Sequence, residues 1–485
     1  MTNSKMKALR ILALLGCVSM AAQANVTLNG LFGDHMVLQR ELPVSIFGTA
    51  DPGEKVTVAF AGQQQAANAG QDGKWAVRLA AMKPTKQAAA MTVTGKNQLT
   101  LQDVVVGDVW VCSGQSNMDW RLAGSNRPDD VKDAAMPLVR QFNVPQGPSD
   151  QPRDEVKSTW VACSPESAPT FTAVGFYFAR KIHRETGIPI GLIHSSWGGT
   201  LIEPWTAPEG LATIPEPMRA GTTLSFVPSA PAVLYNAMIH PLTRFPIKGA
   251  LWYQGESNAL FDANNSEEKY YNKMVALING WRKVWNIGEF PFYYVQLVSF
   301  DQQDKTFGGP EQWPAVRMGQ LRALAIPHTG MAVAIDLADP GNPKDIHPKN
   351  KLDVGERLAR WALARDYGKK DLLCSGPLYK AMRVEGSKIR IAFDFTGTGL
   401  MVGKKNGYEP VIADPQEKLQ CFTIAGEDRK WVPANAVIDG KTVVVSSPEV
   451  PKPVAVRYAF SENPAGCNLG NKAGLPASPF RSDDW

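Results

Sequence analysis

Between residues 104 and 368 the chain alternates short apolar runs with amphipathic segments, and this alternation constrains its fold more than any other feature. The runs with strand character are 104–112, 190–193, 250–253, 292–297 and 331–335. The segments with helical periodicity are 172–185, 266–285 and 352–365. Strands that alternate with helices predict an α/β fold with a mostly parallel sheet. Because ligands of such sheets bind beyond the carboxyl ends of the strands, motifs that directly follow a strand are the first candidates for a site.

Segments rich in β structure flank this region on both sides, and 485 residues are too many for one hydrophobic core. The clearest alternating runs are 44–47, 55–60, 74–79, 388–393 and 442–445. We therefore expect an N-terminal β domain at 25–103, an α/β domain at 104–368 and a C-terminal β domain at 369–485. The two flanking domains are expected to be sandwich-like.

Residues 1–24 have the features of a signal peptide. Basic residues precede an apolar stretch at 11–20 that is too short to cross a bilayer, and Ala22-Gln23-Ala24 provides a small-residue cleavage site. We expect export to the periplasm or medium, and no membrane span in the rest of the chain. Leu14-Leu15-Gly16-Cys17 allows an alternative, in which a lipid anchor is attached at Cys17.

Charge and cysteine content narrow the choice of partners. A formal net charge of +5 with no dense basic run argues against nucleic acid. The absence of CxxC or histidine-rich spacing argues against a metal site. An odd number of cysteines remains after the leader, so at least one is free unless it joins two chains. Cys112–Cys163 and Cys421–Cys467 are candidate disulfides, and the sequence decides neither the pairing nor the oligomeric state.

The first candidate motif is Cys112-Ser113-Gly114-Gln115-Ser116-Asn117-Met118, directly after the expected strand 104–112. A serine at a strand-to-helix turn has its own backbone N–H and the N-terminus of the next helix available to stabilise an oxyanion. Ser116 is therefore a candidate nucleophile. A plain helix N-cap is the alternative, and Ser113 is the competing hydroxyl.

The second motif, Ser195-Ser196-Trp197-Gly198-Gly199-Thr200, follows the strand 190–193. Paired glycines allow the backbone to approach a ligand closely and to present an N–H group. Gly198 and Gly199 are therefore candidate oxyanion donors. A simple turn explains the same residues.

The third motif, Tyr253-Gln254-Gly255-Glu256-Ser257-Asn258, follows the strand 250–253. A side-chain amide at this place can donate to an oxyanion, and the Glu256 carboxylate can hold a neighbour in position. A capped helix start is the alternative, since Ser257 and Asn258 both suit that position.

Asp345-Ile346-His347-Pro348 forms the fourth motif, in a loop after the strand 331–335. His347 is a candidate general base and Asp345 a candidate orienting carboxylate. His194, at the end of the strand 190–193, is the second choice for the base. No single motif is specific, but each follows a predicted strand, and together they supply a nucleophile, a base and oxyanion donors.

These motifs resemble the ordered blocks of SGNH-type hydrolases, and most closely those of the sialate O-acetylesterase family and its bacterial acetylxylan esterase relatives. The matching segments are 114–118, 197–200, 254–258, 345–348 and Leu31-Phe32-Gly33-Asp34-His35-Met36-Val37-Leu38-Gln39. The resemblance covers about residues 26–366. Four blocks in the right order are far more specific than any one of them.

The resemblance implies a flavodoxin-like three-layer α/β/α domain and acyl transfer without a metal or other cofactor. It assigns Ser116 as nucleophile, His347 as base, and the N–H groups of Ser116 and of Gly198 or Gly199 as oxyanion donors. The chain departs from the wider superfamily at two places. The usual asparagine donor of the third block is missing, and we expect the Gln254 amide, or else Asn258, to replace it. The usual aspartate three residues before the histidine is Lys344 here, and Asp345 lies two before.

The expected function is hydrolysis of acetyl esters on sugars, with sialic acid, xylan and xyloglucan as candidate carriers. Side chains near the motifs are candidate contacts for such a substrate: Glu256, Asn258, Trp197, Trp205 and Trp120.

Three other classes remain open. A glycoside hydrolase would use Glu256 with Glu203 or Asp345. A non-catalytic protein would bind carbohydrate through the β domains. A protease or lipase would use the same serine, but the sequence around Ser116 lacks a G-x-S-x-G elbow.

Overall fold

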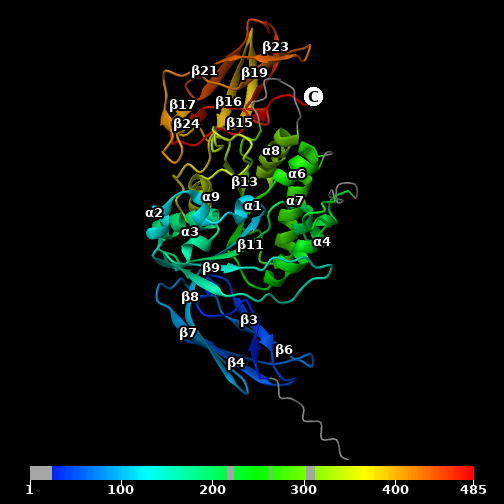
Figure 1. Cartoon of the computed structure of the whole chain (residues 1–485), viewed down its shortest axis with the longest axis vertical. Coiled ribbons are helices and arrows are strands. Elements are labelled where there is room, and N and C mark those ends of the chain that lie inside the picture. The colour runs from blue at the N-terminus through cyan, green and yellow to red at the C-terminus, as the bar shows by residue number, and fades with distance from the viewer. Residues whose placement is uncertain (1–24, 216–222, 263–264, 302–311) are drawn as a thin grey trace, which may run out of the picture.

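One strand, β8 (Gln98–Gly114), joins the N-terminal β region to the central sheet (Figure 1). In the computed structural model, the described residues are 25–215, 223–262, 265–301 and 312–485. The expected signal peptide and lipid-attachment site at Cys17 lie outside them. No helix of the described part is both long and apolar enough to cross a membrane.

The lower half of β8 belongs to the N-terminal β region. That region contains β1 (Thr27–Leu28), β2 (Val37–Gln39), β3 (Val44–Thr49), β4 (Lys55–Phe60), β5 (Gln63–Asn68), β6 (Lys74–Leu79) and β7 (Ala89–Thr94). Strands β1, β3 and β6 form one sheet, while β4, β5 and β7 connect to β8. Asp103, within β8, has a left-handed φ of 55°, and the residues after it enter the central sheet. The expected boundary between residues 103 and 104 therefore falls within one continuous strand.

The central sheet has the strand order β10-β9-β11-β8-β12-β13-β14. Its other members are β9 (Met136–Asn143), β10 (Trp160–Cys163), β11 (Ile190–Ser196), β12 (Gly249–Tyr253), β13 (Phe292–Gln296) and β14 (Thr329–Val333). All neighbours in this order are parallel except β10, which pairs antiparallel with β9. The five strands predicted from the sequence are present.

Helices pack beside this sheet in two groups, with α3 and α9 on one side in Figure 1 and α4, α6, α7 and α8 on the other. The helices are α1 (Ser116–Asp119), α2 (Pro128–Lys132), α3 (Ala173–Thr186), α4 (Pro208–Leu211), α6 (Glu256–Phe261), α7 (Glu267–Trp285), α8 (Gln312–Arg322) and α9 (Lys351–Arg365). The segments predicted as helices correspond to α3, α7 and α9. The sequence did not indicate β9, β10 or α8. In α8 the buried face carries polar side chains, since Arg317 and Gln320 are almost fully buried, so no apolar periodicity marks it.

The C-terminal β region has its own hydrophobic core and lies beyond the carboxyl ends of the central strands (Figure 1). Its strands are β15 (Leu378–Glu385), β16 (Lys388–Asp394), β17 (Leu400–Lys404), β18 (Ile412–Ala413), β19 (Phe422–Gly426), β20 (Trp431–Pro433), β21 (Asn435–Asp439), β22 (Thr442–Ser446), β23 (Pro453–Tyr458), β24 (Leu469–Asn471) and β25 (Phe480–Arg481). The N-terminal β region instead shares one continuous core with the α/β region.

The five cysteines among the described residues are free thiols. Cys112 and Cys163 cannot pair, because β11 and β9 lie between their strands in the sheet. Three strand spacings of about 4.8 Å exceed the reach of a disulfide. Cys421 and Cys467 are also unpaired, and the Cys421 thiol instead donates to the carbonyl oxygens of Pro464 and Ala465.

Gly114 ends β8 where it passes very close to β12. Its φ is 135°, and a Cβ at this position would lie 2.1 Å from the Tyr253 carbonyl oxygen. Only glycine therefore permits the turn that leads into Ser116.

We expect Gly114→Ala to lower the free energy of unfolding by about 1–3 kcal/mol from backbone strain alone. Urea unfolding followed by circular dichroism measures this change. Gly33→Ala is the control, because a Cβ on Gly33 has no neighbouring atom within 4 Å. Equal stability of the two variants would contradict this account of the turn.

Candidate active site

Ser116 lies where the carboxyl ends of three strands meet. The Gln115 backbone N–H donates to the Tyr253 carbonyl at 2.9 Å, and the Trp197 N–H donates to the Gly114 carbonyl at 3.1 Å. These bonds hold the ends of β8, β12 and β11 together. Ser116 is half-buried at the start of α1, whereas Ser113 is fully buried within β8. Of the two candidate hydroxyls, Ser116 is therefore the one that reaches the surface of the site.

His347 lies against Ser116, although 231 positions separate them in the sequence. The distance from His347 Nε2 to Ser116 Oγ is 2.9 Å. On the other side of the ring, His347 Nδ1 lies 3.1 Å from Asp345 Oδ1, which also accepts the His347 backbone N–H at 2.9 Å. Hydroxyl, imidazole and carboxylate are thus in line, with both ring nitrogens engaged, as nucleophile activation requires.

Asn117 ties the two halves of this arrangement together. Its side-chain amide donates to the Ile346 carbonyl oxygen at 2.9 Å and to Glu256 Oε1 at 2.5 Å. Its Oδ1 accepts a hydrogen bond from the Lys351 ammonium. The side chains of Asn117, Glu256 and Lys351 are all buried. The residue next to the serine therefore anchors the backbone of the histidine loop.

The paired glycines of the second motif lie beside Ser116. A Cβ on Gly198 would be 3.2 Å from the Ser116 Cβ, so the backbone of this loop passes directly by the serine. Gly199 has a φ of 79°, a conformation that favours glycine. The loop is thus placed where its N–H groups can face a group attached to Ser116.

The structure contradicts the predicted role of the Gln254 amide as an oxyanion donor, because both of its hydrogens are already used. Gln254 is fully buried, and its Nε2 donates to the Thr200 carbonyl at 3.1 Å and to Asn258 Oδ1 at 2.7 Å. Asn258, the second choice, is also fully buried and donates to Glu203 Oε2 at 3.2 Å. Since Asn258 Oδ1 also accepts the Ile202 N–H, these amides support the glycine loop from behind.

Burial also removes most of the predicted substrate contacts. Glu256 is 1% exposed, and Asn258 and Trp205 are fully buried, so none of them can touch a sugar in this structure. Trp205 is a core residue whose indole N–H donates to Thr200 Oγ1 at 2.9 Å. Trp197 is half-buried at the glycine loop and keeps part of its surface accessible. Trp120 is also half-buried and stacks on the His347 ring, with centroids 5.4 Å apart.

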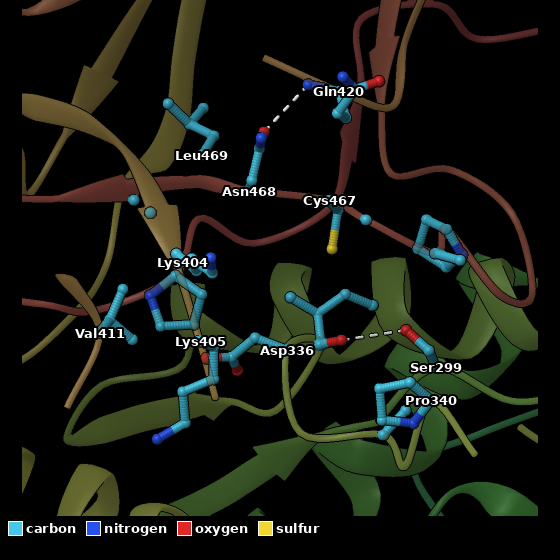
Figure 2. Close-up of a pocket in the computed structure, with 18 of the residues that line it drawn as sticks. Ser299, Asp336, Pro340, Lys404, Lys405, Val411, Gln420, Cys467, Asn468 and Leu469 are labelled. Carbon is cyan, nitrogen blue, oxygen red and sulfur yellow. Dashed lines mark hydrogen bonds between the residues drawn. The ribbon is translucent and has the colours of Figure 1, made fainter. Parts of the chain in front are cut away.

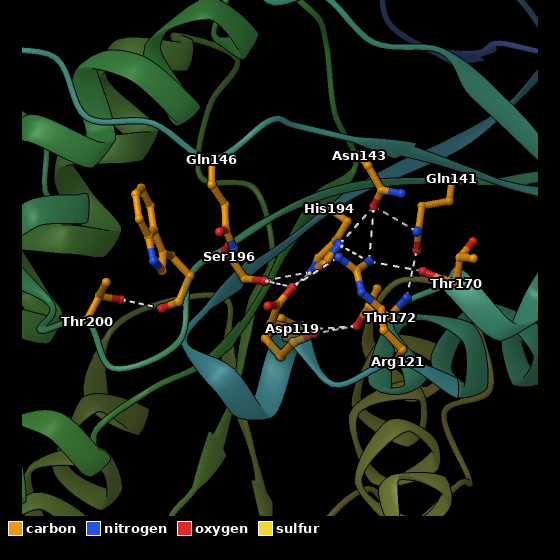
Figure 3. Close-up of polar contacts among 12 residues, drawn as sticks. Asp119, Arg121, Gln141, Asn143, Gln146, Thr170, Thr172, His194, Ser196 and Thr200 are labelled. Atoms are coloured by element: carbon orange, nitrogen blue, oxygen red, sulfur yellow. Dashed lines mark hydrogen bonds and ion pairs between the residues drawn. The ribbon is translucent and has the colours of Figure 1, made fainter. Parts of the chain in front are cut away.

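His194, the second choice for the base, belongs to a separate polar cluster (Figure 3). Its Nε2 is 2.6 Å from Ser196 Oγ, and its Nδ1 is 3.0 Å from Asn143 Oδ1 and 3.1 Å from Arg121. Burial, aided by the Arg121 charge, lowers the pKa of His194 to about 3. A neutral, enclosed imidazole of this kind ties strand ends together, and His347 remains the imidazole at Ser116.

The C-terminal β region contributes a residue that the sequence did not indicate. The Tyr408 hydroxyl donates to the Lys349 carbonyl at 2.8 Å and also contacts the Ser125 carbonyl. It therefore bridges the segment after the nucleophile and the segment after the base. Nearby, the Asn350 amide donates to the Gly407 carbonyl at 3.0 Å. No local pattern around residue 408 marks this contact, because it depends on how two separate regions pack.

Comparison with known proteins identifies the family. A family model described as "Carbohydrate esterase, sialic acid-specific acetylesterase" matches residues 106–364. The sialate O-acetylesterases of Mus musculus and Homo sapiens are each 32% identical to this chain, over 97% and 92% of its length and 96% and 90% of theirs. This chain belongs to the sialic acid-specific acetylesterase family of carbohydrate esterases. The predicted family resemblance is therefore confirmed.

A solved structure supports the same assignment for this esterase. The crystal structure of a carbohydrate acetylesterase from Xanthomonas citri has a TM-score of 0.84 and 40% sequence identity. The match covers 95% of this chain and 100% of that one. The mixed α/β architecture and the arrangement of its flanking β regions are thus shared with a carbohydrate acetylesterase.

Burial and neighbouring ammonium groups keep this esterase's imidazole neutral. Burial lowers the pKa of His347, the ammonium groups of Lys351 and Lys349 lower it further, and the Asp345 carboxylate only partly opposes them. Burial would raise the pKa of Asp345, but the His347 N–H and the Lys349 ammonium outweigh it and lower the pKa. Asp345 is therefore ionised and His347 unprotonated near neutral pH, as a base and its orienting carboxylate must be.

Lys351 and Glu256, which both bind Asn117, have pKa values shifted by burial. Burial lowers the pKa of Lys351 to about 7, although the Glu256 carboxylate opposes the shift. Burial raises the pKa of Glu256, with Asn117 and Lys351 opposing. Within the described residues, no group of three histidine, cysteine, aspartate or glutamate side chains converges as a metal site.

We expect Lys351→Met to raise the pKa of His347, since it removes the cation that lowers that pKa most. The base must be neutral, so the acid limb of kcat/KM will move to higher pH by roughly one unit. In the unmodified esterase that limb should lie below 6.5, the ordinary histidine value. The rate of 4-nitrophenyl acetate hydrolysis, measured across pH for the variant and for the unmodified esterase, gives the acid limb of each.

Lys344→Met is the control for this shift, because Lys344 is an exposed lysine near the same loop. Its removal should leave the limb in place. An unchanged limb in Lys351→Met would show that this ammonium does not act on His347.

Proposed function

We propose that this esterase hydrolyses O-acetyl groups on sugars with Ser116 as nucleophile, His347 as general base and Asp345 as the carboxylate that orients the imidazole. The alignment of hydroxyl, imidazole and carboxylate at 2.9 and 3.1 Å carries the proposal. We further propose that the central domain is an SGNH-type three-layer α/β/α unit. The parallel order β11-β8-β12-β13-β14 supports this, since it corresponds to the flavodoxin-like order 2-1-3-4-5.

The reaction proceeds in two steps. His347 Nε2 takes the Ser116 proton as the oxygen attacks the acetyl carbon, and the imidazolium then protonates the leaving sugar hydroxyl. In the second step His347 deprotonates a water molecule, which attacks the acetyl-serine ester and releases acetate. Asp345 stabilises the imidazolium in both steps.

Two backbone N–H groups, those of Ser116 and Gly198, are the proposed oxyanion donors. The close passage of Gly198 beside the Ser116 Cβ supports this assignment. Gln254 and Asn258 act indirectly, because their hydrogen bonds to Thr200 and Ile202 fix the loop that carries the glycine. Each direct donor is expected to contribute about 100- to 1,000-fold to turnover.

Burial of the carboxylates argues against the glycoside hydrolase alternative. Glu256 and Glu203 are each 1% exposed, and Glu203 pairs with the Lys273 ammonium at 2.6 Å. Neither can reach a glycosidic oxygen in this structure. A purely sugar-binding protein would have no need for the serine–imidazole alignment.

The names of the relatives point to sialate and other carbohydrate acetyl esters as substrates of this esterase.

We also propose export of the protein through residues 1–24, supported by their charge and hydropathy pattern. N-terminal sequencing of the mature protein should begin at Asn25, whereas a lipid-modified N-terminus at Cys17 would favour the anchored alternative.

We expect Ser116→Ala to lower kcat by at least about 10⁴-fold, because the attacking oxygen is lost. The measurement is acetate release from 4-nitrophenyl acetate and from acetylated carbohydrates. Ser113→Ala is the matched control, a serine three residues earlier that is buried within β8, and it should retain activity. Substantial acetate release by Ser116→Ala would refute the proposed nucleophile.

A further inference from the structure

A cavity of about 680 Å³ lies between the α/β region and the C-terminal β region (Figure 2). Its volume is within the range of about 300–1,000 Å³ typical of small-molecule sites. Figure 2 shows Ser299, Asp336 and Pro340 on one side and Gln420, Asn468 and Leu469 on the other. Both regions of the chain therefore form its walls.

The lining combines apolar surfaces with hydrogen-bonding groups. Ile335, Pro464, Leu469 and Leu475 supply buried apolar surface. The polar or charged side chains of the lining that are exposed or half-buried include Asp339, Lys404, Asp414, Glu417 and Gln420. Pro340, Ala465 and Gly466 add exposed apolar surface. Sugar rings have apolar faces and an edge of hydroxyl groups, so a cavity of this composition fits them.

The cavity adjoins the catalytic loop. Its wall includes six residues of the segment from Ile335 to Pro343, which follows the carboxyl end of β14 and leads directly to Asp345 and His347. Its opposite wall includes Lys405, whose ammonium binds Asp353 of α9. Three residues further on, the Tyr408 hydroxyl contacts the carbonyl oxygens of Ser125 and Lys349, which lie nine residues after Ser116 and two after His347. The segment between β14 and His347 thus connects the cavity wall with the reacting groups.

The charges around the cavity favour a neutral ligand. Asp336 is neutralised by Arg357, with contacts of 2.6 and 2.7 Å. Lys405 is neutralised by Asp353. The other charged lining residues are three carboxylates, on Asp339, Asp414 and Glu417, against the one ammonium of Lys404. An anionic sugar such as a sialoside would meet net repulsion here.

We propose that this interdomain cavity is a subsite for neutral sugar residues that neighbour the acetylated one, so that the esterase acts on acetylated oligo- or polysaccharide chains. The proposal rests on the proposed acetylesterase function and extends it to the substrate class. The C-terminal β region then contributes directly to substrate recognition, through β17 and the segment after it.

The experiment compares acetylated xylo-oligosaccharides of increasing length with 4-nitrophenyl acetate. Val411→Trp places an indole in the cavity, and Val437→Trp is the matched control on the exposed strand β21. For the unmodified esterase we expect KM to fall as the oligosaccharide lengthens. Val411→Trp should raise KM for long oligosaccharides about tenfold and leave kcat/KM for 4-nitrophenyl acetate unchanged. Val437→Trp should behave as the unmodified protein does.

Two further measurements keep the test decisive. Should Val411→Trp fail to fold, the double variant Asp414→Ala, Gln420→Ala provides the same comparison through lost hydrogen bonds. A KM that is independent of chain length, or an acetylated sialoside hydrolysed as efficiently as the long neutral chain, would overturn the subsite. Failure to hydrolyse 4-nitrophenyl acetate at all would instead overturn the proposed function, because that ester does not need the cavity.

Discussion

The hydrogen bonds of Asn117 hold the site in register. One amide group reaches the Ile346 carbonyl on the histidine loop and the Glu256 carboxylate after β12, while its oxygen accepts from Lys351 at the start of α9. Two segments far from Asn117 in sequence, the one after β12 and the one from Ile346 to Lys351, thus meet at the residue that follows the nucleophile. Since imidazole and hydroxyl must align within tenths of an ångström, a buried tie of this kind is what preorganises them.

Two buried side chains of opposite charge, Lys351 and Glu256, lie around Asn117. A buried ammonium and a buried carboxylate each lose hydration, and their mutual attraction repays only part of that cost. Lys351 and Glu256 accordingly shift toward their neutral forms. Burial lowers the pKa of His347 most, and among the charged groups that act on it the Lys351 ammonium lowers that pKa most, so the imidazole stays unprotonated. Perturbed pKa values of this kind are common at functional sites.

The sequence predicted the strand segments of the central sheet and selected Ser116, His347 and Asp345, and in the structure His347 lies within hydrogen-bonding distance of the other two. This was possible because a motif that follows a strand lies at the edge of the sheet. The sequence did not predict which side chains after the strands point into the core and which face the site. Gln254, Asn258, Glu256 and Trp205 follow strands too, but they point inward and have internal partners. Periodicity also missed α8, whose buried face is polar. The role of Tyr408 could not be predicted from the sequence, because its hydrogen bonds arise only where the C-terminal β region packs against the α/β region.

The continuity of β8 has a consequence for how this enzyme can be altered. The strand starts within the N-terminal sheet and finishes at the turn before Ser116, and one hydrophobic core spans both regions. An appended binding module can be exchanged at a linker without disturbing its neighbour. Between the N-terminal β region and the α/β region there is no such linker, because β8 runs through both. Replacing the N-terminal β region would therefore also disturb the strand that positions Ser116.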